Sequence, residues 1–176
     1  MQNQRQVVIN FGLMQGLLSV ALAVVLYATG NYNISGQSDA NILYSILNLI
    51  VSVIFPLLAI MKVREIGEGF ISFGKAFGVS FQVILISAIL GAIWLLIYTT
   101  TLEPNFQEAI LQQNYEQFAD QGMSTDQIDN ALEMTKRFTT PTFMSLFAVL
   151  TSAFFGAIIS LILAGVLQRK DPNQIV

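Results

Sequence analysis

The run ILYSILNLIVSVIFPLLAIM, residues 42–61, contains no aspartate, glutamate, lysine or arginine. Thirteen of its residues are leucine, isoleucine, valine or phenylalanine, and at about 0.3 to 0.6 kcal/mol each they favour insertion into a lipid bilayer by roughly 4 to 8 kcal/mol. A helix over this run, rising about 1.5 Å per residue, is long enough to cross a hydrocarbon core of about 30 Å. The run therefore predicts a transmembrane helix, which neither Asn48 nor Pro56 should prevent from inserting.

Three further runs have the same character, at residues 7–28, 79–98 and 143–167. Over the whole chain 54% of residues are hydrophobic and 11% are charged, whereas soluble proteins carry about 25% charged residues. The first run, preceded by Arg5, could also be read as a signal peptide, but its apolar part exceeds the usual length of about 7 to 15 residues. We therefore expect an all-α integral membrane protein, with a four-helix bundle that forms a single membrane domain over residues 1–176.

Basic residues are distributed unevenly between the two ends of these runs. Two of them, Lys136 and Arg137, lie between the third and fourth runs, whereas six flank the opposite ends: Arg5, Lys62, Arg64, Lys75, Arg169 and Lys170. With the acidic residues counted, the side with six bases has a net charge of +3 and the other side −6. Because basic residues stay on the cytoplasmic side, we expect both termini in the cytoplasm and residues 103–140 in the periplasm.

The segment between the third and fourth runs contains residues that are typical of the beginnings and ends of two helices. Pro104 suits a first helical turn and Gly122 suits a helix end. Ser124 and Gln127 match a capping box at the start of a second helix, and Pro141 ends that helix because the residue before a proline avoids the helical conformation. We expect residues 103–140 to form an external helical hairpin with a solvated surface or, as the sharper alternative, a partner-binding surface. The shorter segment 29–41, rich in Asn, Gly and Ser, is expected to be a plain connector.

On the cytoplasmic side, residues 62–78 combine phenylalanines at helical spacing with charges on other faces. This pattern predicts an amphipathic segment that lies in the membrane interface or extends the third helix, although its glycines also permit a bent or re-entrant path. The plainer interpretation is a juxtamembrane anchor, and the functional one is a docking site for anionic lipid or a cytoplasmic partner. The candidate contact residues are Phe70, Phe73, Lys75 and Phe77.

Small and neutral polar residues within the runs indicate how the helices pack. Small residues spaced four apart allow two helix backbones to approach closely. We expect Asn48 to bind another helix through a hydrogen bond worth about 0.6 to 2 kcal/mol, rather than to bind a substrate. The sequence leaves open whether the contacts form within one chain or between protomers. The helix-packing candidates are Gly12, Gly16, Asn48, Ser87, Gly91, Ser152, Gly156 and Ser160.

The composition lacks several residue types that enzymes commonly use for catalysis. The chain contains no cysteine and no histidine, which are common nucleophiles, bases and metal ligands. The four runs contain no acidic or basic residue, so they lack the buried charges typical of proton relays and ion pathways. No basic stripe suits nucleic acid. We therefore expect no catalytic residue, no cofactor and no metal site, with the lipid bilayer, other membrane proteins or further copies of the chain as partners.

The run Gly69-Phe-Ile-Ser-Phe-Gly-Lys-Ala-Phe77, followed by Ala131-Leu-Glu-Met134 and then Pro141, resembles a family of small bacterial membrane proteins. That family is catalogued as a domain of unknown function, the 4199 family. The likeness covers nearly the whole chain, and its motifs are architectural. It implies a location in the bacterial inner membrane and no particular activity or catalytic residue.

The function is unknown, and three hypotheses compete. The leading one is a non-enzymatic inner-membrane accessory or assembly protein that holds partners through its small residues, its internal aromatic segment or its acidic hairpin. The alternative is an oligomeric protein for permeation or transport of small solutes or lipid, in which Asn48 and Gln82 line a path. An enzyme is the third, and it would be favoured if Tyr27, Tyr98 and external acids converged on a closed pocket.

Overall fold

The computed structural model describes residues 3–30 and 39–169, and the structural statements below concern those residues. Most of the expected connector over residues 29–41 lies outside them, as does Lys170, one of the six bases assigned to the cytoplasmic side.

Six α-helices make up the described part of the chain, which contains no β-strand. Four of these helices are long and apolar enough to cross a membrane. The predicted all-helical class and the four predicted apolar helices of membrane-spanning length are thereby confirmed. The elements are α1 (Gln4–Ala28), α2 (Asp39–Ile66), α3 (Phe73–Ile97), the π-helical turn η1 (Tyr98–Leu102), α4 (Phe106–Asp120), α5 (Thr125–Phe138) and α6 (Pro141–Leu167).

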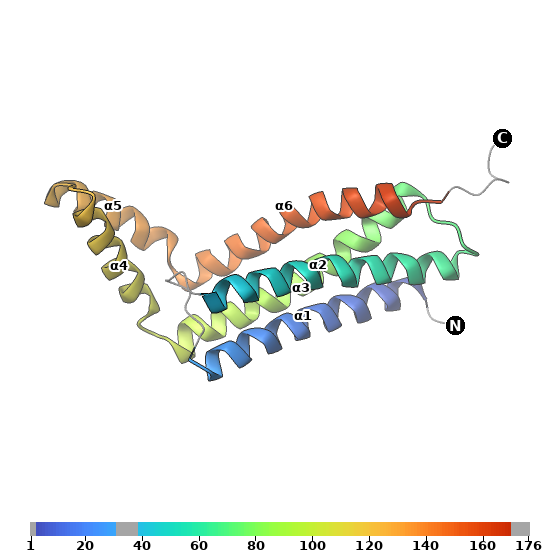
Figure 1. Ribbon diagram of the computed structural model, residues 1–176, viewed down its shortest axis with the longest axis horizontal. Coiled ribbons are helices and arrows are strands. Elements are labelled where there is room, and N and C mark those ends of the chain that lie inside the picture. Colours follow the sequence, from blue (N-terminus) through green and yellow to red (C-terminus); the bar gives the residue numbers. More distant parts are fainter. Residues whose placement is uncertain (1–2, 31–38, 170–176) are drawn as a thin grey trace.

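Figure 1 shows the four long helices side by side, with α3 running between α1 and α6. Helix α3 packs against α1, α2 and α6, and α1 also packs against α2, whereas the contact between α2 and α6 is small. The beginnings of α1 and α3 and the ends of α2 and α6 lie at one end of the molecule. We call it the linker end, because residues 67–72 join α2 to α3 there. The hairpin of α4 and α5 projects from the opposite end.

The buried hydrophobic core is concentrated toward the linker end. Away from this core the long helices expose large apolar side chains, such as Leu49 on α2 and Phe154 on α6, with exposed fractions of 60% and 65%. Such surfaces suit contact with lipid tails, which are as apolar as leucine. The buried core residues are Val7, Val8, Ala59, Ile60, Val63, Ile71, Ala76, Val79, Val83, Leu163 and Ala164.

Residues 62–78, for which the sequence allows an interfacial segment, an extension of the third helix or a bent path, are divided between two long helices. Helix α2 continues beyond Met61 to Ile66, and α3 begins at Phe73. Between them Glu68 and Gly69 adopt positive φ angles of 56° and 91°, the left-handed conformation that commonly ends a helix. The charges of residues 62–65 therefore belong to the last turns of α2 and not to a separate interfacial helix.

Helices α4 and α5 form a hairpin whose turn carries the predicted residues. Gly122 adopts a φ of 77° just after α4 ends, and the Ser124 backbone N–H donates to Gln127 Oε1 over 3.0 Å at the start of α5. Helix α4 begins at Phe106, after Pro104 and not at it. Across the hairpin, Gln107 Nε2 donates to the backbone oxygen of Lys136 over 2.8 Å, which links the beginning of α4 to the end of α5.

Candidate functional site

The glycines of α1 face α3 at close range. A Cβ atom added at Gly12 would lie 2.8 Å from Ile86 Cβ, and one added at Gly16 would lie 3.1 Å from the backbone Cα of Ser87. Ordinary van der Waals contacts begin at about 3.4 Å, so neither position accepts a larger residue without movement of α3. The pair Gly12 and Gly16 thus lies against another helix of the same chain.

The small residues of α6 also lie against α3. A Cβ added at Gly156 would lie 2.7 Å from Ile84 Cγ2. One turn further along, Ser160 Oγ donates a hydrogen bond to Ser80 Oγ over 2.8 Å, and both residues have exposed fractions of 0%. Buried hydroxyl groups are usually hydrogen-bonded, and this bond provides each of the two with a partner.

Three other packing candidates lie in less crowded places. Ser152 is half-buried on α6, and the space around Gly91 is open, because a Cβ added there would meet no atom within 4 Å. The Asn48 side chain was expected to bind a neighbouring helix, but its Nδ2 donates to the backbone oxygen of Tyr44 within α2, over 3.4 Å. The carbonyl one turn back is always within reach of an asparagine in a helix, so this local bond competes with bonds across helices.

The end of α2 is shaped by a tight turn that returns the chain toward α3. The Gly69 N–H donates to the backbone oxygen of Arg64 over 2.9 Å, and the Phe70 N–H donates to that of Gly67 over 3.0 Å. Gly69 has a φ of 91°, which glycine adopts without steric cost. This geometry brings the segment that follows α2 back alongside the last turn of that helix.

A two-residue bridge ties the end of α6 to this linker. The Ile71 N–H donates to the backbone oxygen of Arg169 over 3.0 Å, and the Arg169 N–H donates to that of Ile71 over 2.9 Å. Ile71 is itself in the core, with an exposed fraction of 2%. The backbone of Arg169 is therefore held in place just beyond the last turn of α6.

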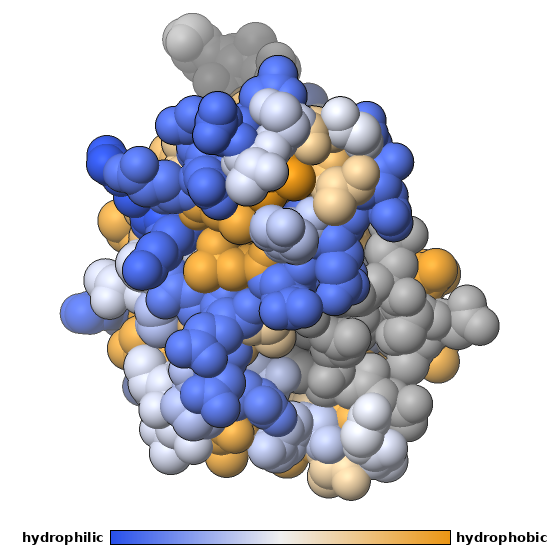
Figure 2. All heavy atoms as spheres, turned by 90° about the vertical axis from the view of Figure 1, so that its left-hand side faces the viewer, coloured by the Kyte–Doolittle hydropathy of each residue, from blue (hydrophilic) through white to orange (hydrophobic). Residues whose placement is uncertain are grey.

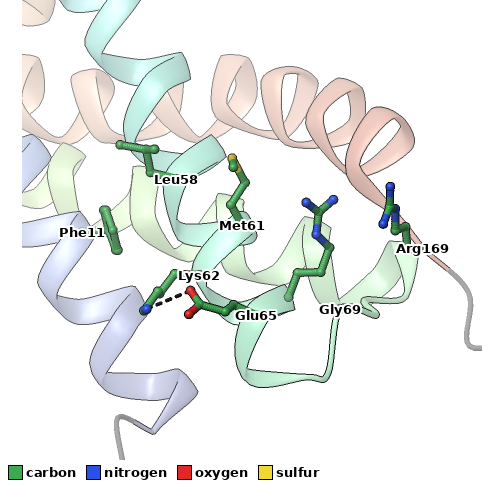
Figure 3. Close-up of a pocket in the computed structure, with 8 residues that line it drawn as sticks. Phe11, Leu58, Met61, Lys62, Glu65, Gly69 and Arg169 are labelled. Carbon is green, nitrogen blue, oxygen red and sulfur yellow. Dashed lines mark hydrogen bonds and ion pairs between the residues drawn. The ribbon is translucent and has the colours of Figure 1, made fainter.

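These elements surround a pocket of about 510 Å³ at the linker end (Figure 3). Lys62 Nζ contacts Glu65 Oε2 at 2.8 Å, whereas the side chains of Arg64 and Arg169 form no hydrogen bond or ion pair with any residue in the described ranges. We call this feature the cationic pocket, because three bases and one acid give it a net charge of +2. Its lining residues are Phe11, Leu58, Met61, Lys62, Arg64, Glu65, Gly69 and Arg169.

The aromatic residues proposed for partner contact lie near this pocket in sequence but not in its lining. Phe73 and Lys75 are exposed in the first turn of α3, and Phe70 is half-buried in the linker. Phe77 packs against the core and stacks on Phe81, with ring centroids 5.6 Å apart. The pocket draws instead on the last turns of α2 and on Arg169. The sequence signal for the α2 part was the change from apolar to charged residues at positions 61 and 62.

At the opposite end, aromatic rings gather where α1 meets the end of α3. The Tyr27 and Tyr98 rings make an edge contact with centroids 5.6 Å apart, and Trp94 lies 6.3 Å from Tyr98. Tryptophan and tyrosine favour the boundary between lipid and water. Across the described ranges, no group of three or more Asp or Glu residues is placed to hold a metal ion. The composition of this cluster matches that preference for the boundary.

The α4–α5 hairpin presents a polar surface with apolar side chains between the charges. Figure 2 views the molecule from the hairpin end and shows hydrophilic residues surrounding a smaller hydrophobic area. Tyr115, Met134 and Phe138 have exposed fractions of 44%, 62% and 51%. Contiguous exposed apolar patches are typical of surfaces that bind other molecules, whereas single exposed apolar side chains are common on any protein.

Comparison with known proteins identifies one relationship. A family model described as "Protein of unknown function (DUF4199)" matches residues 10–169. Neither the curated proteins nor the solved structures contain a significant match to this sequence.

Proposed function

The chain belongs to the DUF4199 family, whose function is unknown, and we propose that it is a non-enzymatic accessory or assembly protein of the bacterial inner membrane. In this proposal the four long helices form a transmembrane four-helix bundle, and the α4–α5 hairpin is an external module that binds a protein partner. The observation that carries the proposal is the exposure of Tyr115, Met134 and Phe138 on that hairpin.

The internal packing of the long helices supports the hairpin as the contact surface. Gly12 and Gly16 are covered by α3, Gly156 lies against Ile84, and Ser160 bonds to Ser80. These small residues, of the kind that membrane helices use to associate, are packed within one chain, whereas Gly91 is not. The hairpin combines exposed apolar side chains with an excess of acidic residues, and we propose it as the contact surface.

The charge of the hairpin indicates the chemistry of its partner. From Glu103 to Arg137 seven residues are acidic and two are basic, and one of the bases, Arg137, is paired with Glu133 at 2.7 Å. Complementary charge accelerates association and orients the partners. We expect the partner to present a basic surface around an apolar patch that receives side chains such as Met134.

The orientation we propose places the linker end in the cytoplasm and the hairpin in the periplasm. Five of the six bases on the predicted cytoplasmic side lie at the linker end within the described ranges: Arg5, Lys62, Arg64, Lys75 and Arg169. Basic residues near the ends of membrane helices are retained in the cytoplasm. The acidic hairpin then faces the periplasm.

Photo-crosslinking in native membranes tests the partner. A photo-reactive phenylalanine analogue at position 115 or 134 is expected to capture one discrete protein, and capture should fall several-fold in the variant Asp120→Asn/Asp129→Asn. The matched control places the analogue at Leu150 of α6, which is 58% exposed and should yield lipid adducts. The proposal fails if neither hairpin position captures a protein, or if Leu150 captures the same protein.

One observation favours the alternative of an oligomeric permeation or transport protein. The Gln82 side chain is exposed on the surface of α3, and an amide facing lipid is costly unless another polar group satisfies it. A second copy of the chain placed against this surface would supply such a group and bring several copies around a polar path. Solute flux into liposomes that contain the protein, reduced by Gln82→Leu, would support this function, and flux equal to that of empty liposomes would exclude it.

A further inference from the structure

We propose that the cationic pocket binds the headgroup of an anionic phospholipid, with one acyl chain lying along the apolar part of the lining. The inference rests on the membrane-spanning part of the proposed function and is independent of whether the hairpin binds a protein. Three features of the pocket carry it: the order of its lining along α2, the net positive charge of its lining residues, and the way its two arginines are held.

The lining of the pocket changes from apolar to charged within one helical turn. Leu58 and Met61 are 41% and 42% exposed on α2, and Lys62 and Arg64 follow them directly toward the linker. Figure 3 shows Leu58 and Met61 on the part of α2 that lies further from the linker than Lys62 and Glu65. A phospholipid has the same order along the membrane normal, with acyl chains toward the centre and phosphate at the surface. A soluble anion would use the charged part of the pocket alone.

Among the described residues, the charge of the pocket is only partly neutralised. Glu65 pairs with Lys62, but no acidic side chain within residues 3–30 or 39–169 pairs with Arg64 or Arg169. A guanidinium group can form two parallel hydrogen bonds to a phosphate group. Basic pockets between membrane helices on the cytoplasmic side are suited to anionic lipid headgroups for this reason.

Both arginines are attached to ordered backbone. Arg64 lies in the last turns of α2, where its carbonyl accepts the Gly69 N–H, and Arg169 is held by two hydrogen bonds to Ile71. A site whose backbone is fixed before binding loses less conformational entropy when the ligand arrives. The pocket volume of about 510 Å³ also lies within the range of about 300 to 1,000 Å³ typical of small-molecule sites.

Lipid titration of the purified full-length protein by native mass spectrometry tests the proposal. We expect phosphatidylglycerol to bind at least tenfold more tightly than phosphatidylcholine. Since a basic residue near an anionic headgroup contributes about 1 kcal/mol, and about 1.4 kcal/mol corresponds to a tenfold change, the variant Arg64→Gln/Arg169→Gln should bind phosphatidylglycerol roughly thirtyfold more weakly. Glycerol 3-phosphate at millimolar concentration should not displace the lipid, because it lacks the acyl chains.

Two further variants separate the site from general effects of charge and from misfolding. Lys136→Gln/Arg137→Gln removes the same charge from the other end of the molecule and should change affinity by less than twofold. Glu65→Gln releases Lys62 from its ion pair and should strengthen phosphatidylglycerol binding about fivefold, a gain that a misfolded protein would not show. Equal binding of the two lipids, equal losses in both double variants, no gain in Glu65→Gln, or displacement by glycerol 3-phosphate would each overturn the proposal.

Discussion

Ser160 Oγ donates a hydrogen bond to Ser80 Oγ over 2.8 Å and so joins α6 to α3 through two hydroxyl groups that are fully buried. The bond lies next to the close contact between Gly156 and Ile84. Small side chains let the two helix backbones approach, and this approach brings the two hydroxyl groups within bonding distance. Steric fit and hydrogen bonding therefore stabilise the same pair of helices.

Removing either hydroxyl group should weaken the pairing of α3 with α6. Ser80→Ala and Ser160→Ala are each expected to lower the free energy of unfolding by about 1 kcal/mol, and the double variant by little more, with a coupling energy of about 0.6 kcal/mol. Reversible unfolding in mixed detergent micelles measures these values. Ser152→Ala, at a half-buried position on the same helix, is the control and should have a smaller effect. Strictly additive losses from the two single variants would show that the bond does not matter.

A methyl group at Gly12 should separate α1 from α3. The added Cβ would lie 2.8 Å from Ile86 Cβ, an atom close to the backbone that cannot rotate away, so Gly12→Ala is expected to cost about 1 to 3 kcal/mol. Gly91→Ala is the matched control, because its Cβ would meet nothing within 4 Å. Thermal unfolding of the purified variants in detergent should show a lower transition temperature for Gly12→Ala alone. Equal transition temperatures for the two variants would contradict the close packing of α1 on α3.

The left-handed turn after α2 should tolerate no side chain at Gly69. Its φ of 91° makes Gly69→Ala unfavourable by about 1 to 2 kcal/mol, and the distortion should reach the bridge between Ile71 and Arg169. Hydrogen exchange of the Arg169 amide, which donates to Ile71, should become faster in this variant. Gly74→Ala places a methyl group in open space on α3 and should leave that exchange unchanged. Unchanged exchange in Gly69→Ala would mean that the turn does not position the bridge.

Labelling with a membrane-impermeant maleimide should reveal the orientation of the chain. The sequence contains no cysteine, so a single cysteine introduced at an exposed position is the one site that the maleimide can label. In cells with a permeabilised outer membrane, Gln113→Cys on α4 should react, whereas Lys75→Cys at the linker end should react only after the inner membrane is opened. The reverse pattern would place the termini in the periplasm, against the distribution of basic residues.

Much of the architecture could be predicted from local sequence patterns. The length and apolarity of four runs were sufficient to identify α1, α2, α3 and α6, because insertion of a helix into lipid depends on the summed transfer free energy of its own residues. The turn of the hairpin could also be predicted from local sequence, since the conformation of Gly122 and the bond between Ser124 and Gln127 depend on neighbours a few residues away. The family was likewise recognised from short motifs, and the match over residues 10–169 confirms it.

Predictions were less accurate where one sequence pattern is compatible with more than one structure. Asn48 was expected to bond across helices, yet its amide bonds to Tyr44 one turn back in α2. For residues 62–78, the sequence left open an interfacial segment, an extension of the third helix or a bent path. In the structure the chain turns at the left-handed Glu68 and Gly69, and α3 begins at Phe73. In both cases the outcome depended on local hydrogen bonds and backbone angles that residue types alone do not reveal.

Spacing and hydropathy along the chain determine that four helices are long and apolar enough to cross a membrane and that a polar helical segment separates the last two, because each of these properties is a sum over consecutive residues. These sums do not determine which helices pack against one another. Ser80 bonds to a residue 80 positions away, and Arg169 enters a pocket built mainly by α2 because the linker bonds to it at Ile71. Such pairings follow from the shapes of surfaces that come together after the helices have formed, and lipid-facing and helix-facing residues are equally apolar. Hydropathy cannot distinguish them, so α3 as the shared neighbour and the cationic pocket are visible in three dimensions alone.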